Sequence, residues 1–257
     1  MSTGPYTLYP FCEVLDTEYG KITVNKHDTA QTGFYRIKRQ AINHEELIRI
    51  RILLDAHIKA KQSTPDERFD IIDVGAHIGT WGLFFSTMPQ ISTIWSYEPL
   101  RVYFDMISHT RALNCGAGNG RGYNIVPVLL AISDKPGYLR VPEFDWTVPT
   151  NFGGIELGGD RQQEFIGQER TGLGETVEVS TVDIEDQDVS HPVALLKVDV
   201  EGMEIKVLRG AQKVITRDRP ILFVEFLKSD QEELRAFFEQ NNYDVQKWHT
   251  DFLCTPR

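Results

Sequence analysis

Five short apolar segments, separated by stretches of helical or irregular character, restrict the fold of this chain more than any other feature. They are Phe69 to Val74, Thr93 to Tyr97, Ile125 to Leu130, Ala194 to Val200 and Ile221 to Phe226. Most of these segments lack polar alternation, which is typical of strands that helices cover on both faces. We therefore expect an α/β, Rossmann-like doubly wound, mainly parallel sheet with its ligand crevice at the carboxyl ends of the strands.

Helical spacing of apolar residues predicts the elements between these strands. The expected helices are Thr80 to Met88, Arg101 to Asn114, Met203 to Ile215 and Asp230 to Gln240. Tyr243 to Trp248 then has the pattern of a strand, and Asp251 to Thr255 is expected to form a short tail. The alternation of strand and helix supports a parallel sheet.

The first 65 residues lie outside this scheme. They contain a possible hairpin, Glu13 to Asn25, and an amphipathic helix, Glu45 to Lys61. A separate domain of this size would have a small core. We therefore predict that residues 1–65 form a cap packed on a main domain of residues 66–257.

A Gly-rich, acidic insertion interrupts the main domain at residues 137–192, with strand-like pieces near Tyr138 to Val141 and Glu178 to Val182. Long insertions at the active end of a sheet often shape a substrate pocket. A solvated surface excursion is the alternative interpretation. Asn151, which precedes Phe-Gly-Gly, is the residue of this region that could supply an amide to a substrate, and a plain Gly-rich turn is the alternative.

The amino-acid composition disfavours several classes of binding partner. Lys and Arg number 27 against 37 Asp and Glu, which gives a net charge of −10 and disfavours nucleic acid as a partner. The three cysteines form no CxxC pair, so neither a disulfide framework nor a cysteine zinc site is indicated. No signal peptide or membrane span is recognisable in the sequence. We expect a soluble cytoplasmic protein that binds no membrane.

The segment Asp73-Val74-Gly75-Ala76-His77-Ile78-Gly79 ends the first predicted strand and opens a helix. Its glycines allow a tight turn and a close approach to a ligand. Glu98, at the end of the second strand, can accept hydrogen bonds from both ribose hydroxyls of a nucleoside. The residues expected to bind the cofactor are Asp73, Gly75, Ala76, His77, Ile78, Gly79, Glu98, Pro99, Ala131, Ser133 and Asp199.

The identity of the cofactor follows from the glycine pattern. A pyrophosphate-binding G-x-G-x-x-G turn would need glycine where His77 and Thr80 stand. S-adenosylmethionine has no pyrophosphate, and its sulfonium and ammonium groups suit acidic neighbours such as Asp73 and Glu98. A structural turn with unrelated acids is the alternative, and His77 could equally pack or cap a helix.

A second group of charged residues follows the fourth strand. Period-two alternation places Lys197, Asp199 and Glu201 on one face, and Glu225 ends the next strand. We expect Asp199 to act as general base, with Glu225 as second choice, Lys197 as an orienting residue and Glu201 as a possible substrate contact. An internal ion pair from Lys197 to Glu201 or Glu225 is the alternative.

Asp199 and Glu225 could also share a divalent metal, because oxygen ligands suit magnesium. Two acids are too few ligands to predict a metal site.

Taken together, the motifs IIDVGAHIG, SYEP, AISDKPG, STVD, LKVDVEGMEIKVLRGA and FVEF resemble those of the FkbM-type methyltransferases. The resemblance covers Ile71 to about Phe226, and His77 stands where that family usually has Asn. It implies a class I fold, S-adenosylmethionine as cofactor, and O-methylation of a hydroxyl on a sugar or other small-molecule acceptor. An NAD-dependent oxidoreductase and a non-catalytic binding module with a nucleotide fold are the alternatives.

Overall fold

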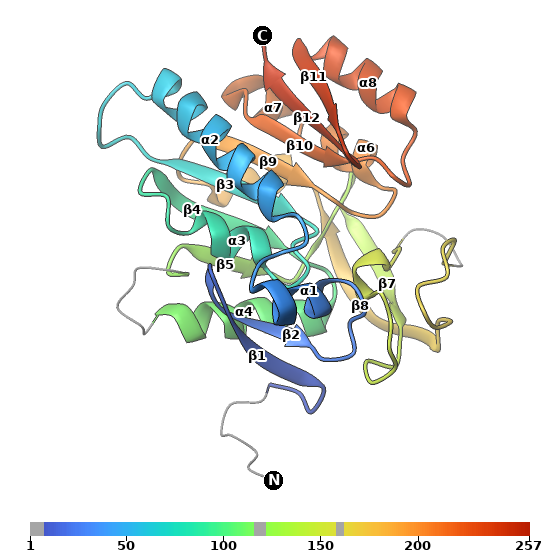
Figure 1. The fold of residues 1–257 in the computed structure, drawn as a ribbon. Coiled ribbons are helices and arrows are strands. Elements are labelled where there is room, and N and C mark those ends of the chain that lie inside the picture. The colour runs from blue at the N-terminus through green and yellow to red at the C-terminus, as the bar shows by residue number, and fades with distance from the viewer. Residues whose placement is uncertain (1–7, 116–121, 158–161) are drawn as a thin grey trace.

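The computed structural model describes residues 8–115, 122–157 and 162–257, and a seven-stranded sheet runs through its centre (Figure 1). The strand order is β11-β12-β10-β9-β3-β4-β5. The strands are β3 Phe69–Val74, β4 Ile91–Tyr97, β5 Ile125–Val128, β9 Val193–Val198, β10 Ile221–Glu225, β11 Tyr243–Trp248 and β12 Asp251–Pro256. All neighbours pair in parallel except β12, which runs antiparallel to β10 and β11. The predicted doubly wound, mainly parallel sheet is confirmed.

The direction of winding reverses between β3 and β9, which are hydrogen-bonded neighbours with Val74 opposite Val198. From β3 the chain proceeds outward to β4 and β5, and from β9 it proceeds the other way to β10. Ligands of open α/β sheets bind at such a reversal, beyond the carboxyl ends of the strands. Gly75 and Asp199 follow these two strand ends directly.

Helices cover both faces of the sheet (Figure 1). The helices of the sheet domain are α2 His44–Lys61, α3 Thr80–Phe85, α4 Arg101–Cys115, α6 Glu204–Arg209, α7 Gln212–Asp218 and α8 Gln231–Gln240. Apolar residues of α2 and α3 join one buried cluster with sheet residues such as Ile71 and Phe223. Apolar residues of α6, α7 and α8 form a second cluster with Val74 and Val224, on the opposite side.

The segment before β3 adds a hairpin, β1 Cys12–Thr17 with β2 Gly20–Asn25, and a short helix α1 Gln31–Lys38. The hairpin lies against α4, where the Thr110 hydroxyl accepts from the backbone N–H of Thr23 at 2.9 Å. Tyr35 of α1 is hydrogen-bonded through its hydroxyl to Thr80 at 2.7 Å. Ile22, Val24 and Tyr35 share the apolar cluster of α2 and the sheet. A domain boundary near residue 65 stays a prediction.

The insertion contributes β7 and β8 (Figure 1), which form a small second sheet of order β6-β8-β7 with the preceding strand β6. Its strands are β6 Ala131–Ile132, β7 Gly137–Glu143 and β8 Gly172–Ser180. A 3-10 turn at Phe152–Gly154 lies between β7 and β8, and the short helices α5 Val182–Glu185 and η2 Asp186–Asp188 lead back to β9. Both predicted strand pieces are therefore present, although Val182 starts a helix because the Thr181 hydroxyl caps it.

Three expectations need correction. The predicted tail Asp251 to Thr255 is a strand, β12, which pairs with β10 and β11 inside the main sheet. The predicted helix Met203 to Ile215 divides into α6 and α7 at Gly210, whose Cα approaches Ser133 so closely that a Cβ would lie 2.1 Å from the Ser133 carbonyl oxygen. The fourth strand ends at Val198, before the acidic residues that were assigned to it.

Candidate active site

A cavity of about 540 Å³ opens beyond the carboxyl ends of β3, β4, β9 and β10. Its volume lies in the usual range of small-molecule sites, about 300–1,000 Å³. The chain segments that close it are the start of α2, the turn at Phe152–Gly154 in the insertion, and Asp251 at the start of β12. The cavity therefore lies at the reversal point of the sheet, where the sequence predicted the ligand crevice.

The glycine turn after β3 packs directly on the loop after β9. Gly75 has φ +77°, and a Cβ at this position would lie 1.8 Å from the carbonyl oxygen of Asp199. The backbone N–H of Asp199 donates to the carbonyl of Val74 at 3.1 Å. Only glycine fits this close approach with a left-handed backbone.

Lys197 connects the glycine turn after β3 with the loop after β9. Its ammonium lies 3.2 Å from Asp73 and 3.5 Å from Asp199, and it donates to the carbonyl oxygen of Gly75 at 2.6 Å. Burial lowers the pKa of Lys197, but the two carboxylates outweigh it, so the net shift is upward and the lysine stays charged. The alternative ion pairs from Lys197 to Glu201 or Glu225 are wrong, because Asp73 and Asp199 hold this ammonium.

Glu98 lies at the end of β4, in the half of the cavity next to β3 and β4, and it is only 4% exposed. One carboxylate oxygen accepts from the N–H of Leu100 at 2.9 Å and the other from the N–H of His77 at 2.8 Å. Each oxygen keeps a lone pair for a further donor. Burial raises the pKa of Glu98 to about 7, against the two backbone hydrogen bonds, which lower it.

His77 lines the same half of the cavity and packs its ring edge-on against Tyr103, with the centroids 4.2 Å apart. Its Nε2 atom is buried and has no hydrogen-bond partner. Burial lowers the pKa of His77 to about 3, so the ring is neutral. The unpartnered nitrogen and the open lone pairs of Glu98 fit a nucleoside with polar groups at this place.

Four residues predicted to bind the cofactor do not line the cavity: Asp73, Ala76, Ile78 and Gly79. Asp73 is completely buried inside the sheet beside Lys197, so it holds the lysine and is shielded from a sulfonium in the cavity. Ala76 and Ile78 belong to the apolar core. Gly79 faces Ile107 of α4. The other predicted contacts, including Pro99, Ala131, Ser133 and Asn151, do line it.

The predicted acids after the strands differ in their surroundings. Asp199 lines the cavity, and its side chain is 42% exposed. Glu225 is 7% exposed, and burial, followed by repulsion from nearby carboxylates, raises its pKa to about 9. A carboxyl group that carries a proton at neutral pH is a poor proton acceptor, so the raised pKa of Glu225 favours Asp199 as the first-choice base. Glu201 has a left-handed backbone and lines the cavity, and it forms no ion pair with Lys197.

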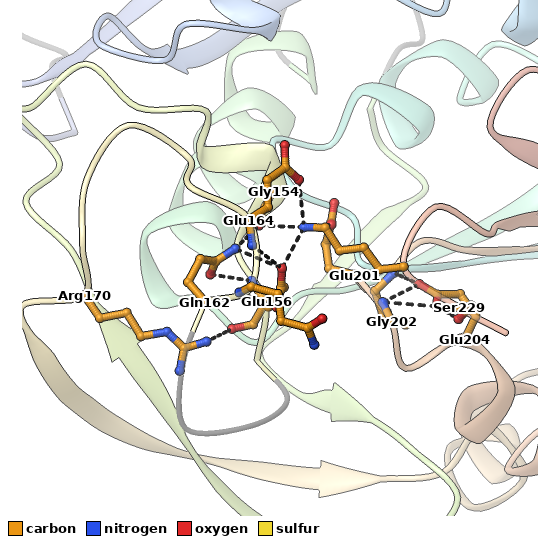
Figure 2. A network of polar contacts seen from close by, with 12 residues as sticks. Gly154, Glu156, Gln162, Glu164, Arg170, Glu201, Gly202, Glu204 and Ser229 are labelled. Atoms are coloured by element: carbon orange, nitrogen blue, oxygen red, sulfur yellow. Dashed lines mark hydrogen bonds and ion pairs between the residues drawn. The ribbon is translucent and has the colours of Figure 1, made fainter.

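Glu201 instead contacts Lys228, a residue that the sequence did not single out. The Lys228 ammonium lies 2.7 Å from Glu201, 3.0 Å from Glu156 and 3.3 Å from Glu164, and it donates to the Gly154 carbonyl at 3.2 Å. Figure 2 shows Glu156 and Glu164 of the insertion facing Glu201 of the loop after β9. Lys228 thus connects the insertion to the loop of residues 199–203 between β9 and α6, which we call the acidic loop.

Glu204, a second residue missed in the sequence, shapes that acidic loop. Its carboxylate accepts from the backbone N–H groups of Val200 and Gly202 at 3.0–3.1 Å and from the hydroxyl of Ser229 (Figure 2). Because Ser229 adjoins Lys228, the loops after β9 and β10 form one connected network. The only sequence signal was position: Lys228 and Ser229 follow the carboxyl end of a predicted central strand.

Two further findings concern metal and membrane. Within residues 8–115, 122–157 and 162–257, no group of three or more histidine, cysteine or acidic side chains is arranged to hold a metal ion. No helix in the described ranges is long and apolar enough to cross a bilayer.

Comparison with known families decides the relationship. The model of the methyltransferase FkbM domain matches residues 73–245. The chain belongs to the FkbM methyltransferase family. The matched range contains the glycine turn, Glu98, Asp199, Glu225 and Lys228, and the family implies S-adenosylmethionine as the methyl donor.

Among solved structures, the FkbM methyltransferase from Methylobacillus flagellatus KT resembles this chain with a TM-score of 0.50 and 17% sequence identity. The alignment covers 74% of this chain and 44% of that one, so the chain spans less than half of that relative's length. A precorrin-6y C5,15-methyltransferase from Geobacter metallireducens GS-15 gives a TM-score of 0.41 at 11% identity, over 84% of this chain and 89% of that one. The first likeness supports the FkbM-type α/β fold. No curated protein matches the sequence.

Proposed function

We propose that this FkbM-family chain transfers the methyl group of S-adenosylmethionine to a hydroxyl group of a sugar or another small metabolite. The observation that carries the proposal is the position of Asp199. Its partly exposed carboxylate follows the strand beside the glycine turn and borders the cavity, and Lys197 links it to that turn.

The chain's residues would divide the cavity into two halves. Gly75, His77 and Glu98 lie on the half toward β3 and β4, where Glu98 can accept from ribose hydroxyls. Ala131 and Ser133 extend this half toward the base of a nucleoside. S-adenosylmethionine, when bound, supplies a methyl group on a positively charged sulfur. The remaining half, at the ends of β9, β10 and β12, is left for the acceptor.

Asp199 would act on the acceptor hydroxyl. The bond from the acceptor oxygen to the methyl carbon forms as the bond from that carbon to sulfur breaks, and the hydroxyl proton passes to the Asp199 carboxylate. The products are a methyl ether and S-adenosylhomocysteine, so atoms and charge balance. Transfer needs the three reacting atoms in line and water excluded. Lys197 and Glu204 would hold the loop that carries Asp199, while Lys228 keeps the insertion over it.

An NAD-dependent oxidoreductase and a non-catalytic binding module were the alternatives from sequence. Family membership and the missing pyrophosphate glycines favour the methyltransferase over the first. The partly exposed Asp199 at the cofactor cavity favours it over the second.

The test is a screen of hydroxylated small molecules with S-adenosylmethionine labelled on its methyl group. We expect label in an ether product, with one S-adenosylhomocysteine formed per methyl transferred. Label found only on nitrogen, carbon or sulfur would contradict O-methylation. Binding of the donor without transfer to any compound of the screen would favour the binding module.

A further inference from the structure

Three carboxyl groups lie at the same edge of three neighbouring strands, on the acceptor side of the cavity: Asp199 follows β9, Glu225 ends β10 and Asp251 begins β12. Val198 of β9 is paired with Val224 of β10, so the next residues, Asp199 and Glu225, lie side by side at the strand ends. Glu225 is also the direct partner of Asp251 in the antiparallel pair of β10 and β12. Side chains opposite each other on adjacent strands share one face, with Cβ atoms about 4.5–5.5 Å apart. All three residues line the cavity.

The two lysines that border this cavity form ion pairs with acids other than Glu225 and Asp251. Lys197 contacts Asp73 and Asp199, and Lys228 contacts Glu156, Glu164 and Glu201. Within the described ranges, neither Glu225 nor Asp251 forms an ion pair. The Oε2 atom of Glu225 is buried and has no hydrogen-bond partner, although the side chain borders an open cavity and is 7% exposed.

The side-by-side carboxyl groups of Glu225 and Asp251 destabilise the folded protein when no ligand is bound. Like charges directly opposite on adjacent strands are destabilising, and a buried carboxyl group without a partner adds a desolvation cost. Burial and the neighbouring carboxylates raise the pKa of Glu225 to about 9 and that of Asp251 to about 7. A cation between the two side chains would relieve the repulsion and provide the missing partner for Oε2.

We propose that the methyl acceptor carries a cationic group, a protonated amine or a guanidinium, which binds between Glu225 and Asp251 while its hydroxyl faces Asp199. The inference rests on the proposed function and names the class of acceptor. A hydrogen-bonding cation fits better than a divalent metal, because no three histidine, cysteine or acidic side chains of the described ranges are arranged to hold a metal ion.

Binding of such a cation has a signature that a neutral acceptor lacks. The bound positive charge favours the ionised form of Glu225, so its pKa falls and the carboxyl group releases its proton. Titrations at pH 7 in buffers of different ionisation enthalpy detect this release as a heat that depends on the buffer. A neutral sugar bound through hydrogen bonds to the protonated carboxyl groups would release none.

The experiment compares hydroxylated compounds in matched pairs that differ only in charge, such as glucosamine with glucose and 4-aminobutanol with 1,4-butanediol. Binding to protein saturated with S-adenosylhomocysteine is measured by calorimetry, and methyl transfer is measured from labelled donor. We expect at least a tenfold preference for the amine members at pH 7, together with proton release. Equal binding, or tighter binding of the neutral members, would overturn the inference.

Two variants test the assignment to these residues. Glu225→Gln replaces a carboxyl group that is already protonated with one of similar shape, so the variant should fold, and Asp251→Asn is its counterpart. Each should reduce the preference for amines to about threefold or less while the affinity for S-adenosylhomocysteine stays unchanged. Glu239→Gln, at an exposed position of α8, should keep the full preference.

Two other outcomes would contradict the inference. If Glu225→Gln weakens S-adenosylhomocysteine as strongly as the amines, the pair binds the cofactor's own ammonium and the inference is wrong. If Mg²⁺ alone binds through these two residues and promotes binding of the neutral compounds, a metal occupies the site and the inference is wrong as well. Failure of the proposed function is distinct, since it would appear as no transfer to oxygen in any compound.

Discussion

Gly75 and Asp199 are packed backbone to backbone, so that a single methyl group on Gly75 would meet the Asp199 carbonyl oxygen at 1.8 Å. This contact couples the turn that would hold the cofactor to the loop that would activate the acceptor. Lys197 strengthens the coupling because it contacts both the Gly75 carbonyl and the Asp199 carboxylate. The relative positions of donor and acceptor would thus depend on one short stretch of packed backbone.

Gly75→Ala should therefore separate the turn from the loop. A left-handed alanine costs about 1–2 kcal/mol and overpacking about 1–3 kcal/mol, so we expect a loss of roughly 2–5 kcal/mol in the free energy of unfolding. Chemical denaturation measures this loss. Gly33→Ala, a helical position with nothing within 4 Å of the added Cβ, is the control and should be neutral or slightly stabilising. Equal stability of the two variants would show that the contact is unimportant.

Asp199→Asn should keep the shape of the loop and remove the proton acceptor. Turnover should fall about 10²- to 10⁴-fold, the usual contribution of a general base, while affinity for S-adenosylhomocysteine stays within a few-fold. Rates and binding curves are measured on the same folded preparation, with and without chelator. A near wild-type rate would exclude Asp199 as the base. A parallel loss of cofactor affinity would instead assign it to cofactor binding.

Glu98 should make cofactor binding depend on pH. Burial raises its pKa to about 7, so the carboxylate that would accept hydrogen bonds from ribose hydroxyls is fully present only above that pH. Affinity for S-adenosylhomocysteine should rise between pH 6 and pH 8 and then level off, with a proton released on binding. His77, with a pKa of about 3, stays neutral throughout this range.

Glu98→Gln isolates this effect from Asp251 and Glu201, whose pKa values are also raised to about 7. The variant should bind the ligand more weakly at pH 8, by roughly 1.5–3 kcal/mol, and should lose the rise between pH 6 and pH 8. An unchanged pH profile in the variant would remove Glu98 from the ribose.

Lys228→Met should loosen the insertion from the acidic loop. Methionine retains the apolar stem of the side chain but leaves Glu156 and Glu201 without their cation. We therefore expect the free energy of unfolding to fall by about 1–3 kcal/mol. Hydrogen exchange should become faster in the segments 150–157 and 162–170 and around Glu201. Lys206→Met, at an exposed position of α6, should leave exchange there unchanged. Unchanged exchange in both variants would contradict a connecting role for Lys228.

The sequence predicted the sheet, and the places of Gly75 and Glu98 at its strand ends, because both depend on local patterns. The apolar runs mark the five parallel strands, and the glycine turn and Glu98 occupy fixed positions at strand ends. Ala76, Ile78 and Gly79 were assigned to the ligand because they share a motif with Gly75. In the structure, the turn directs Ala76 and Ile78 into the core and sets Gly79 against α4.

The second half of the site depends on pairings distant in the sequence, which periodicity alone does not reveal. Asp251 becomes a cavity residue only because β12 inserts between β10 and β11, where a tail was expected. Alternation placed Glu201 beside Lys197, but β9 ends at Val198 and Glu201, which has a left-handed backbone, contacts Lys228. The high pKa of Glu225 arises first from its burial and then from carboxylates distant in the sequence, such as Asp199 and Asp251.

We expect the cavity beyond the carboxyl ends of β3 and β4 to bind the methyl donor. Calorimetry with S-adenosylhomocysteine and with NAD on the unmodified protein tests it most directly, because the two ligands share an adenosine and differ in the pyrophosphate. We predict saturable binding of S-adenosylhomocysteine at one site per chain and no heat with NAD. Absence of binding by S-adenosylhomocysteine, or clear binding of NAD, would show that this cavity is not a methyl-donor site.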